Sequence, residues 1–278
     1  MNYQFTHDKR MLEYDLMRSY PGIFCFSTTR HGGYSTGEYS SFNCNAFCGD
    51  DVAAVTNNRH LLATLMPQRP DALVIPHQTH GTEARLINDD FIRCSDFTRQ
   101  ALLEGVDALI TNVPGQCICV STADCIPLIC FDKRQRVAAV IHAGWRGTVA
   151  RIVSKTLHAM KQAYGSNPTD MAVCLGPGIS CKAFEVGDEV YAAFAEAGFD
   201  MGCIAHKEFE KWHIDLWEAN RRLLIAEGVP ESLIHVSNLC TYTNNEDFFS
   251  ARRQGINSGR ILTGIMLLKE KEEEIHEA

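Results

Sequence analysis

The 278-residue sequence contains no block dense in lysine and arginine, only short basic pairs. Its 34 acidic and 26 basic residues give a net charge of -8. Nucleic-acid binding rests on clustered cations, so we expect no nucleic-acid partner. No apolar run reaches membrane-spanning length, and the N-terminal segment mixes charges throughout, unlike a secretory signal. These absences favour a cytoplasmic protein with no membrane partner, and no obligate protein partner is evident.

Cys-x-x-Cys spacing is also absent, although the sequence has 12 cysteines. Closed structural zinc sites commonly use that spacing, so we expect no such site. Most of the cysteines lie inside apolar, strand-like runs, as Cys117, Cys119 and Cys130 do. In a small secreted domain twelve cysteines would indicate disulfides, whereas this pattern favours buried thiols in a reducing cytoplasm.

What the sequence does contain is an apolar fraction of 45%, sufficient for a sizeable core. It shows no internal repeat, low-complexity linker or compositional break, so we expect one domain over residues 1–278. Short apolar runs bounded by turn residues predict strands. They lie within residues 22–30, 72–81, 106–111, 117–125, 126–132, 137–142, 171–180 and 261–268.

Helical periodicity and capping signals occur between these runs. Asp50 or Asp51 can cap the first helix, and Asp215 with Glu218 forms a capping pair for the last. The charged end of the chain, residues 269–278, is expected to be a solvated tail. Strands interspersed with helices indicate an α+β fold. The helices are expected at about residues 52–66, 149–164, 186–198 and 216–227.

Three segments place a metal-capable residue where an apolar run meets a turn. They are HQTHG with His77 and His80, ADC with Cys125, and HAGW with His142. Catalytic zinc sites take three protein ligands from His, Cys and carboxylates and keep a fourth position open, which a His, Cys, His set satisfies. Cys125 could equally be a core thiol and His142 a structural histidine. Spacing does not choose between His77 and His80.

Two glycine-containing turns are candidates for anion binding. GWRG contains Arg146, and LGPGIS follows a predicted strand. Backbone N–H groups at such turns and a guanidinium fork both suit phosphate or carboxylate. The alternative for each is a tight turn with a surface ion pair. The loop over residues 31–45 is rich in Gly, Ser and Asn, and long loops of this kind often carry function.

Seven motifs support a family resemblance when they are taken together. The sequence resembles the multicopper polyphenol oxidoreductase laccase family, also called the YfiH or laccase-domain family, over about residues 23–266. The resemblance implies an α+β fold of mixed β-sheets packed face to face, with helices on the outside. The motifs are TTRHGGYSTGEYSSFN, HQTHG, DALIT, ADCIPL, HAGWRGT, LGPGIS and FFSARRQGINSGR.

The resemblance also implies which residues form the site. It assigns a catalytic zinc ion to His80, Cys125 and His142, which leaves His77 outside the ligand set. Asp124, or a water on the metal, would then transfer protons. The sequence departs from the family pattern at Thr79, Ala251 and Ser258, where valine, an aromatic residue and threonine are usual. None of these departures is at an implied ligand.

The activities that the resemblance implies are those of a purine nucleoside enzyme. They are phosphorolysis of adenosine, inosine and methylthioadenosine to the base and ribose 1-phosphate, and deamination of adenosine to inosine. Zinc lowers the pKa of a bound water to about 7, which suits attack on a purine C6. The partners would be a small purine nucleoside and phosphate, with Arg30, Asn43 and Arg146 as the candidates that bind them.

Other functions fit the same residues. Copper-dependent phenol oxidation is one, because Cys and His ligands also bind copper, although the sequence lacks the His-x-His pairs common in multicopper oxidases. A second alternative is a hydrolase that edits peptidoglycan precursors, in which His142 activates Cys125 as a nucleophile. A third, without catalysis, is a protein that binds nucleotides or stores zinc.

Overall fold

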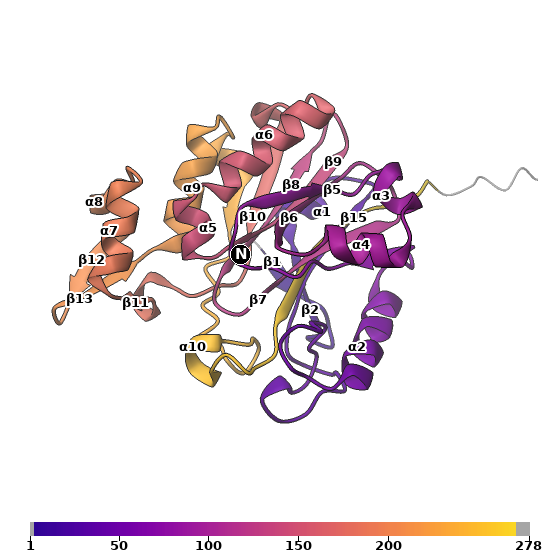
Figure 1. Cartoon of the computed structure of the whole chain (residues 1–278), viewed down its shortest axis with the longest axis horizontal. Helices are drawn as coiled ribbons and strands as arrows, with labels where there is room; N and C mark the ends of the chain where they lie inside the picture. The colour runs from indigo at the N-terminus through magenta and orange to yellow at the C-terminus, as the bar shows by residue number, and fades with distance from the viewer. Residues whose placement is uncertain (1–2, 271–278) are drawn as a thin grey trace, which may run out of the picture.

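A computed structural model describes residues 3–270 of the chain (Figure 1). Two six-stranded sheets form its centre, and both contain parallel and antiparallel pairs. The two sheets pack face to face, and helices cover the outer faces. The predicted α+β fold class is therefore confirmed. The expected C-terminal tail lies mostly outside the described residues, since these end at 270.

The first sheet joins the two ends of the chain. Its C-terminal strand lies between an N-terminal strand and a central one and is antiparallel to both. The order is β1 (Tyr3–Phe5), β2 (Met11–Tyr14), β3 (Ile23–Thr28), β15 (Ile261–Leu267), β7 (Gln116–Thr122) and β4 (Ala72–Val74).

The second sheet carries most of the chain's central strands. Each of its four inner strands is antiparallel to the inner strand beside it, and each edge strand runs parallel to its neighbour. The order is β14 (Ile234–Val236), β10 (Met171–Leu175), β8 (Ile126–Asp132), β9 (Val137–Ala143), β6 (Val106–Thr111) and β5 (Glu83–Leu86).

Apolar side chains from both sheets meet in one core. Ile118 and Val120 of the first sheet share a buried cluster with Leu109, Ile129 and Val140 of the second. Each such side chain stabilises the fold by about 1.5–3 kcal/mol on burial. The central strands are almost continuously apolar because one face meets the other sheet and the opposite face meets helices. Because burial on both faces makes these strands so apolar, the apolar runs in the sequence were sufficient to predict their positions.

The helices occupy the outside of the sandwich. In Figure 1, α6 and α9 lie against the second sheet, and α2 packs through Leu62 beside the first. A small sheet projects from the sandwich together with α7 and α8; it comprises β11 (Glu185–Val186), β13 (Lys211–Ile214) and β12 (Ala205–Glu208). The α-helices are α1 (Asp15–Arg18), α2 (Val52–Leu65), α3 (Asp89–Arg93), α4 (Asp96–Leu102), α5 (Trp145–Val149), α6 (Ile152–Tyr164), α7 (Asp188–Glu196), α8 (Met201–Ile204), α9 (Leu216–Ala226) and α10 (Ala251–Gln254). Short 3-10 turns occupy Gly37–Tyr39, Pro168–Asp170, Cys181–Ala183 and Glu231–Leu233.

Local structure corrects one predicted helix and resolves one cap. The helix expected over 149–164 begins only at Ile152, as α6, and residues 145–149, most of which were expected to form a turn, form the separate helix α5. Arg151 separates the two helices, because its backbone adopts left-handed angles of φ 62° and ψ 44°. Asp51, rather than Asp50, caps α2 by accepting from the N–H of Ala54. The Asp215 side chain accepts from the N–H of Glu218, as predicted.

Two further expectations concern membranes and thiols. Within residues 3–270, no helix combines the length and the apolar character needed to cross a bilayer. All twelve cysteines are free thiols. Seven of them are buried, and five of these seven lie in strands of the two sheets: Cys25, Cys117, Cys119, Cys130 and Cys174.

Candidate metal centre

The fold brings three metal-capable side chains from separate segments to one place. His80 lies in the loop after β4, Cys125 in the turn between β7 and β8, and His142 near the end of β9. One ligand atom from each lies within 4.8 Å of the others. Two imidazole nitrogens and one thiol sulfur at this spacing form a donor set of the kind that catalytic zinc uses. The three residues could therefore bind a metal ion.

Backbone geometry at tight turns holds these side chains together. His80 and the neighbour of Cys125, Asp124, both have positive φ angles, of 63° and 85°. Strand pairing places His142 opposite Pro127, two residues after Cys125. Gly144 lies so close that a Cβ atom there would be 2.9 Å from the Cys125 sulfur. The site thus requires the absence of a side chain at this position.

A buried carboxylate, which the sequence analysis did not select, orients two of the candidate ligands. Asp107 of β6 is fully buried and accepts a hydrogen bond from Nδ1 of His142 over 2.7 Å. It also accepts from the N–H groups of His80 and Gly81, at 3.0 and 2.7 Å. Because Nδ1 of His142 donates to Asp107, Nε2 is left for a metal. The sequence signal is an acidic residue inside the apolar run VDALIT.

Charge coupling favours the metal-binding form of the thiol. Burial raises the pKa of Cys125, but the positive charge of His142 and hydrogen bonds from His142 and His80 outweigh that effect and lower it. Burial likewise lowers the pKa of His142, while the Cys125 thiolate and Asp107 raise it above its usual value. Before a metal binds, the pair therefore favours a thiolate beside an imidazolium, and the thiolate is the form that binds metal.

His77 lies near the group without belonging to it. Its Nδ1 atom is 2.7 Å from Oε1 of Glu104, and its ring stacks on Phe47 with centroids 4.5 Å apart. The buried carboxylate of Asp107, which supports the candidate ligands, accepts from the backbone N–H of His80 and not from that of His77. His77 therefore forms part of the surrounding wall.

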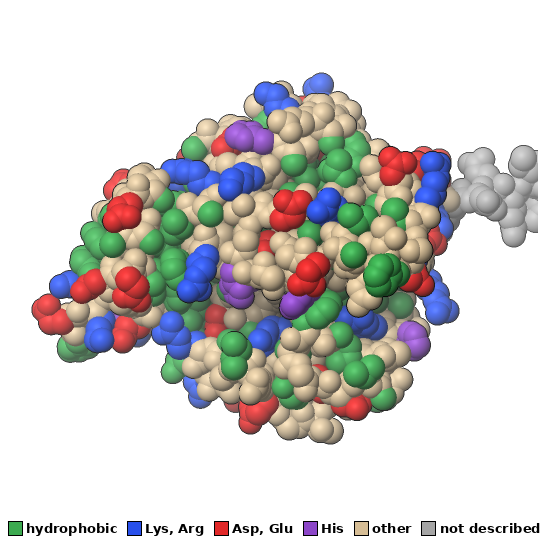
Figure 2. Space-filling model, viewed as in Figure 1, with side chains coloured by type: hydrophobic (Ala, Val, Ile, Leu, Met, Phe, Trp, Pro, Cys, Tyr) green, Lys and Arg blue, Asp and Glu red, His purple; other side chains and the backbone are tan. Residues whose placement is uncertain are grey.

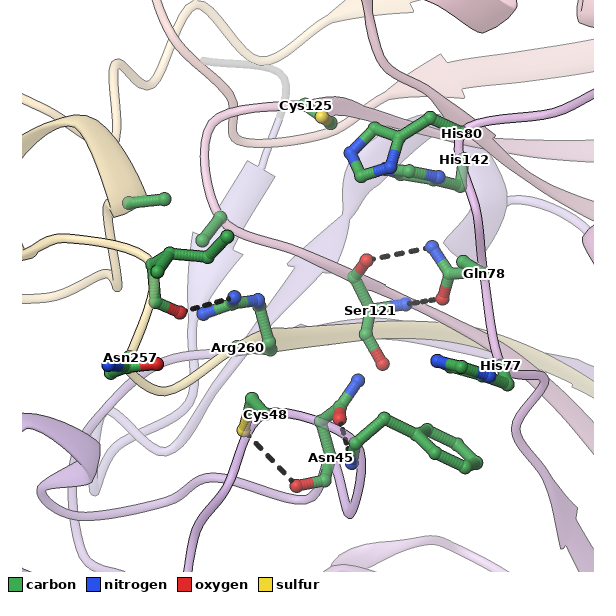
Figure 3. A pocket seen from close by; sticks show the side chains of 14 residues that line it. Asn45, Cys48, His77, Gln78, His80, Ser121, Cys125, His142, Asn257 and Arg260 are labelled. Atoms are coloured by element: carbon green, nitrogen blue, oxygen red, sulfur yellow. Dashed lines mark hydrogen bonds between the residues drawn. The ribbon is translucent and has the colours of Figure 1, made fainter. Parts of the chain in front are cut away.

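The candidate ligands open into a cavity of about 490 Å³. Figure 2 shows histidine side chains beside a hollow near the centre of the viewed face, and Figure 3 shows the side chains that line it. From the sequence, the loops HGGYSTGEY (31–39) and NNEDFFSARRQ (244–254) are expected to flank the site. The second of these loops contributes Ala251 to the lining, whereas no residue of 31–39 lines the cavity. Residues 45–48 and 256–260 form that part of the wall. The lining residues are Asn45, Phe47, Cys48, His77, Gln78, His80, Ser121, Ala123, Cys125, His142, Ala251, Ile256, Asn257 and Arg260.

The three candidates for phosphate or substrate binding lie outside this lining. Arg30 donates from Nε to the carbonyl of Ser40 and stacks over Phe249. The Asn43 side chain is fully buried and supports the surrounding loop. Arg146 is exposed and stacks on Trp145. Arg260, which does line the cavity, was not among the predicted residues although it lies in the motif FFSARRQGINSGR. Its sequence neighbours do not show which arginine of the chain faces a cavity.

Asp124, the candidate for proton transfer, is buried beside Cys125. One carboxylate oxygen accepts from the Thr241 hydroxyl and the other from the N–H of Arg252, both over 2.6 Å. These bonds connect the Cys125 turn to α10 and to the segment that precedes it. Both oxygens of Asp124 are therefore bonded to the protein, and Asp124 is not part of the cavity lining.

Comparison with known proteins gives a consistent result. The profile of the family described as multi-copper polyphenol oxidoreductase laccase matches residues 24–268. A purine nucleoside phosphorylase from Bacteroides thetaiotaomicron is 52% identical over 95% of this chain and 98% of its own length. Adenosine deaminase RL5, from an unknown prokaryotic organism, is 42% identical over 90% of this chain and 96% of its own.

A solved structure agrees with these relatives. The crystal structure of YlmD from Geobacillus stearothermophilus superimposes with a TM-score of 0.87 and 30% identity. The match covers 96% of this chain and 99% of that one. Sequence profile, relatives and fold agree over nearly the whole length. The chain therefore belongs to the multi-copper polyphenol oxidoreductase laccase family, which its seven motifs had indicated.

Proposed function

We propose that this protein is a zinc-dependent purine nucleoside enzyme. It cleaves adenosine, inosine and methylthioadenosine with phosphate, and it deaminates adenosine to inosine. The observation that carries the proposal is the His80, Cys125 and His142 group, which opens into a cavity. Support comes from relatives named purine nucleoside phosphorylase and adenosine deaminase, which match this chain over most of its length.

The cavity suits a nucleoside in size and chemistry. Its volume of about 490 Å³ is within the usual range for small-molecule sites. Phe47 is exposed at the rim, where a planar base can stack. The amide of Asn257 offers both a donor and an acceptor for a purine edge.

Each residue of the centre has a distinct role in this proposal. His80, Cys125 and His142 bind the ion, and Asp107 fixes the tautomer of His142. When bound, zinc supplies a Lewis acid next to the substrate. Electrostatic interactions with the substrate are stronger inside such a cavity than in bulk water.

The test is a chromatographic assay of metal-quantified protein with adenosine, with and without phosphate. We expect adenine only when phosphate is present, and inosine without it. Cys125→Ala should lose both products, whereas Cys203→Ser, which changes an exposed cysteine, should retain them. Absence of both products from wild type that carries stoichiometric zinc contradicts the proposal.

A hydrolase is the second candidate, because Asp107, His142 and Cys125 form a continuous chain of interactions. Thiol hydrolases use this order of carboxylate, histidine and cysteine. Peptidoglycan precursors would then be the substrates. Such an enzyme needs a free thiolate, so iodoacetamide should inactivate it without prior removal of metal. A zinc-dependent nucleoside enzyme should instead be protected by its metal.

A further inference from the structure

We propose that Ser121, Arg260 and Asn45 form the site that binds the phosphate co-substrate. All three line the cavity that contains the candidate metal ligands. The proposal rests on the proposed function and deepens it, because it locates the second substrate of phosphorolysis. It also places phosphate on residues other than Arg30, Asn43 and Arg146, which lie outside the lining.

Ser121 provides a buried hydroxyl with no protein partner. The residue is 6% exposed, and within the described chain its Oγ atom makes no hydrogen bond. Its backbone is fixed, because Gln78 accepts from its N–H at 2.7 Å and donates to its carbonyl at 2.9 Å. Buried polar groups are nearly always paired, so an orphaned hydroxyl in a cavity wall indicates a ligand contact.

Arg260 provides a cation that the protein holds in place without neutralising it. Nη1 donates to the carbonyls of Ser258 and Gly259, and Nη2 donates to that of Ile256. These three bonds leave one N–H on Nε and one on Nη2, the edge of the guanidinium that binds phosphate side-on. Among residues 3–270, no carboxylate forms an ion pair with it.

Asn45 adds an amide donor. Its Oδ1 atom accepts from the N–H of Phe47 over 2.6 Å, which fixes the orientation of the side chain. Within the described chain its Nδ2 atom has no acceptor of its own. In Figure 3 the Asn45 amide and the Ser121 hydroxyl point into the same part of the cavity, away from Cys125.

These three groups match the chemistry of an oxyanion. Each can donate a hydrogen bond, one is cationic, and none of the described residues that line the cavity is acidic. In the reaction an oxygen of monohydrogen phosphate bonds to C1′ while the bond from C1′ to N9 breaks. The electron pair and the phosphate proton pass to the purine, and ribose 1-phosphate forms. The site would hold phosphate while the base occupies the rest of the cavity.

The experiment compares Ser121→Ala and Arg260→Lys with wild-type holoenzyme. Loss of a hydrogen bond to a charged group should raise the KM for phosphate by about 10-fold or more. Phosphate-independent deamination of adenosine should keep its kcat/KM. Ser121→Ala should melt no lower than wild type, because the lost hydroxyl makes no protein contact. A KM for phosphate within twofold of wild type in both variants overturns the proposal.

Matched controls exist for both substitutions. Ser166 also has a buried, unpartnered hydroxyl but lies outside the cavity lining, so Ser166→Ala should leave the KM for phosphate unchanged. Arg59 donates from Nε to the carbonyl of Cys44 outside the lining, and Arg59→Lys is the control for charge-preserving change. If deamination loses affinity for adenosine instead, the groups bind the nucleoside and the proposal is wrong.

A direct binding measurement separates this proposal from the proposed function. Inorganic phosphate is titrated calorimetrically into zinc-loaded wild type, Ser121→Ala and Arg260→Lys. Binding by wild type that both variants lose supports the subsite, even if no product forms. Product formation with unchanged phosphate binding in the variants refutes the subsite alone. Absence of phosphate binding by wild type also refutes it.

Discussion

Nδ1 of His142 donates to Oδ1 of Asp107 over 2.7 Å, and the same carboxylate accepts from the backbone at residues 79–81. One buried side chain therefore orients two candidate ligands. It fixes the His142 ring directly and His80 through the turn that carries it. Hydrogen bonding to His142 and its charge overcome burial and lower the pKa of Asp107, so the carboxylate stays ionised.

Asp107→Asn should weaken zinc binding by about 10- to 100-fold. The amide has the right size, but it presents an N–H group in place of one of the two accepting oxygens. The measurement is the zinc dissociation constant by competition with a chromogenic chelator. Asp71→Asn, which changes an exposed carboxylate paired with Lys269, is the control and should bind zinc as wild type does. Equal affinity in both variants would show that Asp107 does not support the site.

His80→Ala, Cys125→Ala and His142→Ala should each lose stoichiometric zinc, because a three-ligand site cannot lose a donor without a large fall in affinity. His77→Ala should keep the metal, since His77 contacts Glu104 and Phe47. Metal content by mass spectrometry, with circular dichroism to confirm folding, makes the comparison. Loss of zinc from His77→Ala to the same extent would overturn this choice of ligands.

Gly144→Ala should reduce zinc affinity and activity with little effect on the fold elsewhere. A Cβ atom there would lie 2.9 Å from Sγ of Cys125 and 3.0 Å from Cδ2 of His80, so both side chains must move. Gly202→Ala is the control, because its Cβ would meet Asp200 at an ordinary 3.4 Å. Zinc affinity and melting temperature are measured for both. A Gly144→Ala protein with wild-type affinity would mean that the site adapts without cost.

Metal removal should expose Cys125 to alkylation. With zinc bound, its sulfur is occupied and should react slowly with iodoacetamide. After chelation, the charge of His142 stabilises the thiolate against the effect of burial, and labelling should accelerate. Peptide mass spectrometry follows the label, with exposed Cys203 as the reference whose rate should not depend on metal. Rapid labelling of Cys125 in the zinc-loaded protein would favour the hydrolase.

Apolar runs and capping residues in the sequence correctly predicted the buried strands and several of the helices. The runs VDALIT and IPLICFD coincide with β6 and β8, because strands buried on both faces are continuously apolar. Strands β1 and β2 escaped prediction because their segment mixes charged and apolar residues. The break between α5 and α6 also escaped, because the left-handed conformation of Arg151 leaves no mark on the apolar period of the helix.

By itself the sequence determined the α+β class, the central strands and the motifs that carry His80, Cys125 and His142. These follow from local composition and from motif order, which one chain displays without reference to its fold. Only the tertiary structure joined Asp107 to His142 and placed Ser121 and Arg260 in one cavity. Such pairs lie far apart in sequence, and strand pairing and sheet packing decide which of them meet. Arg30, Arg146 and Arg260 have the same chemistry, and their position in the fold alone distinguishes them.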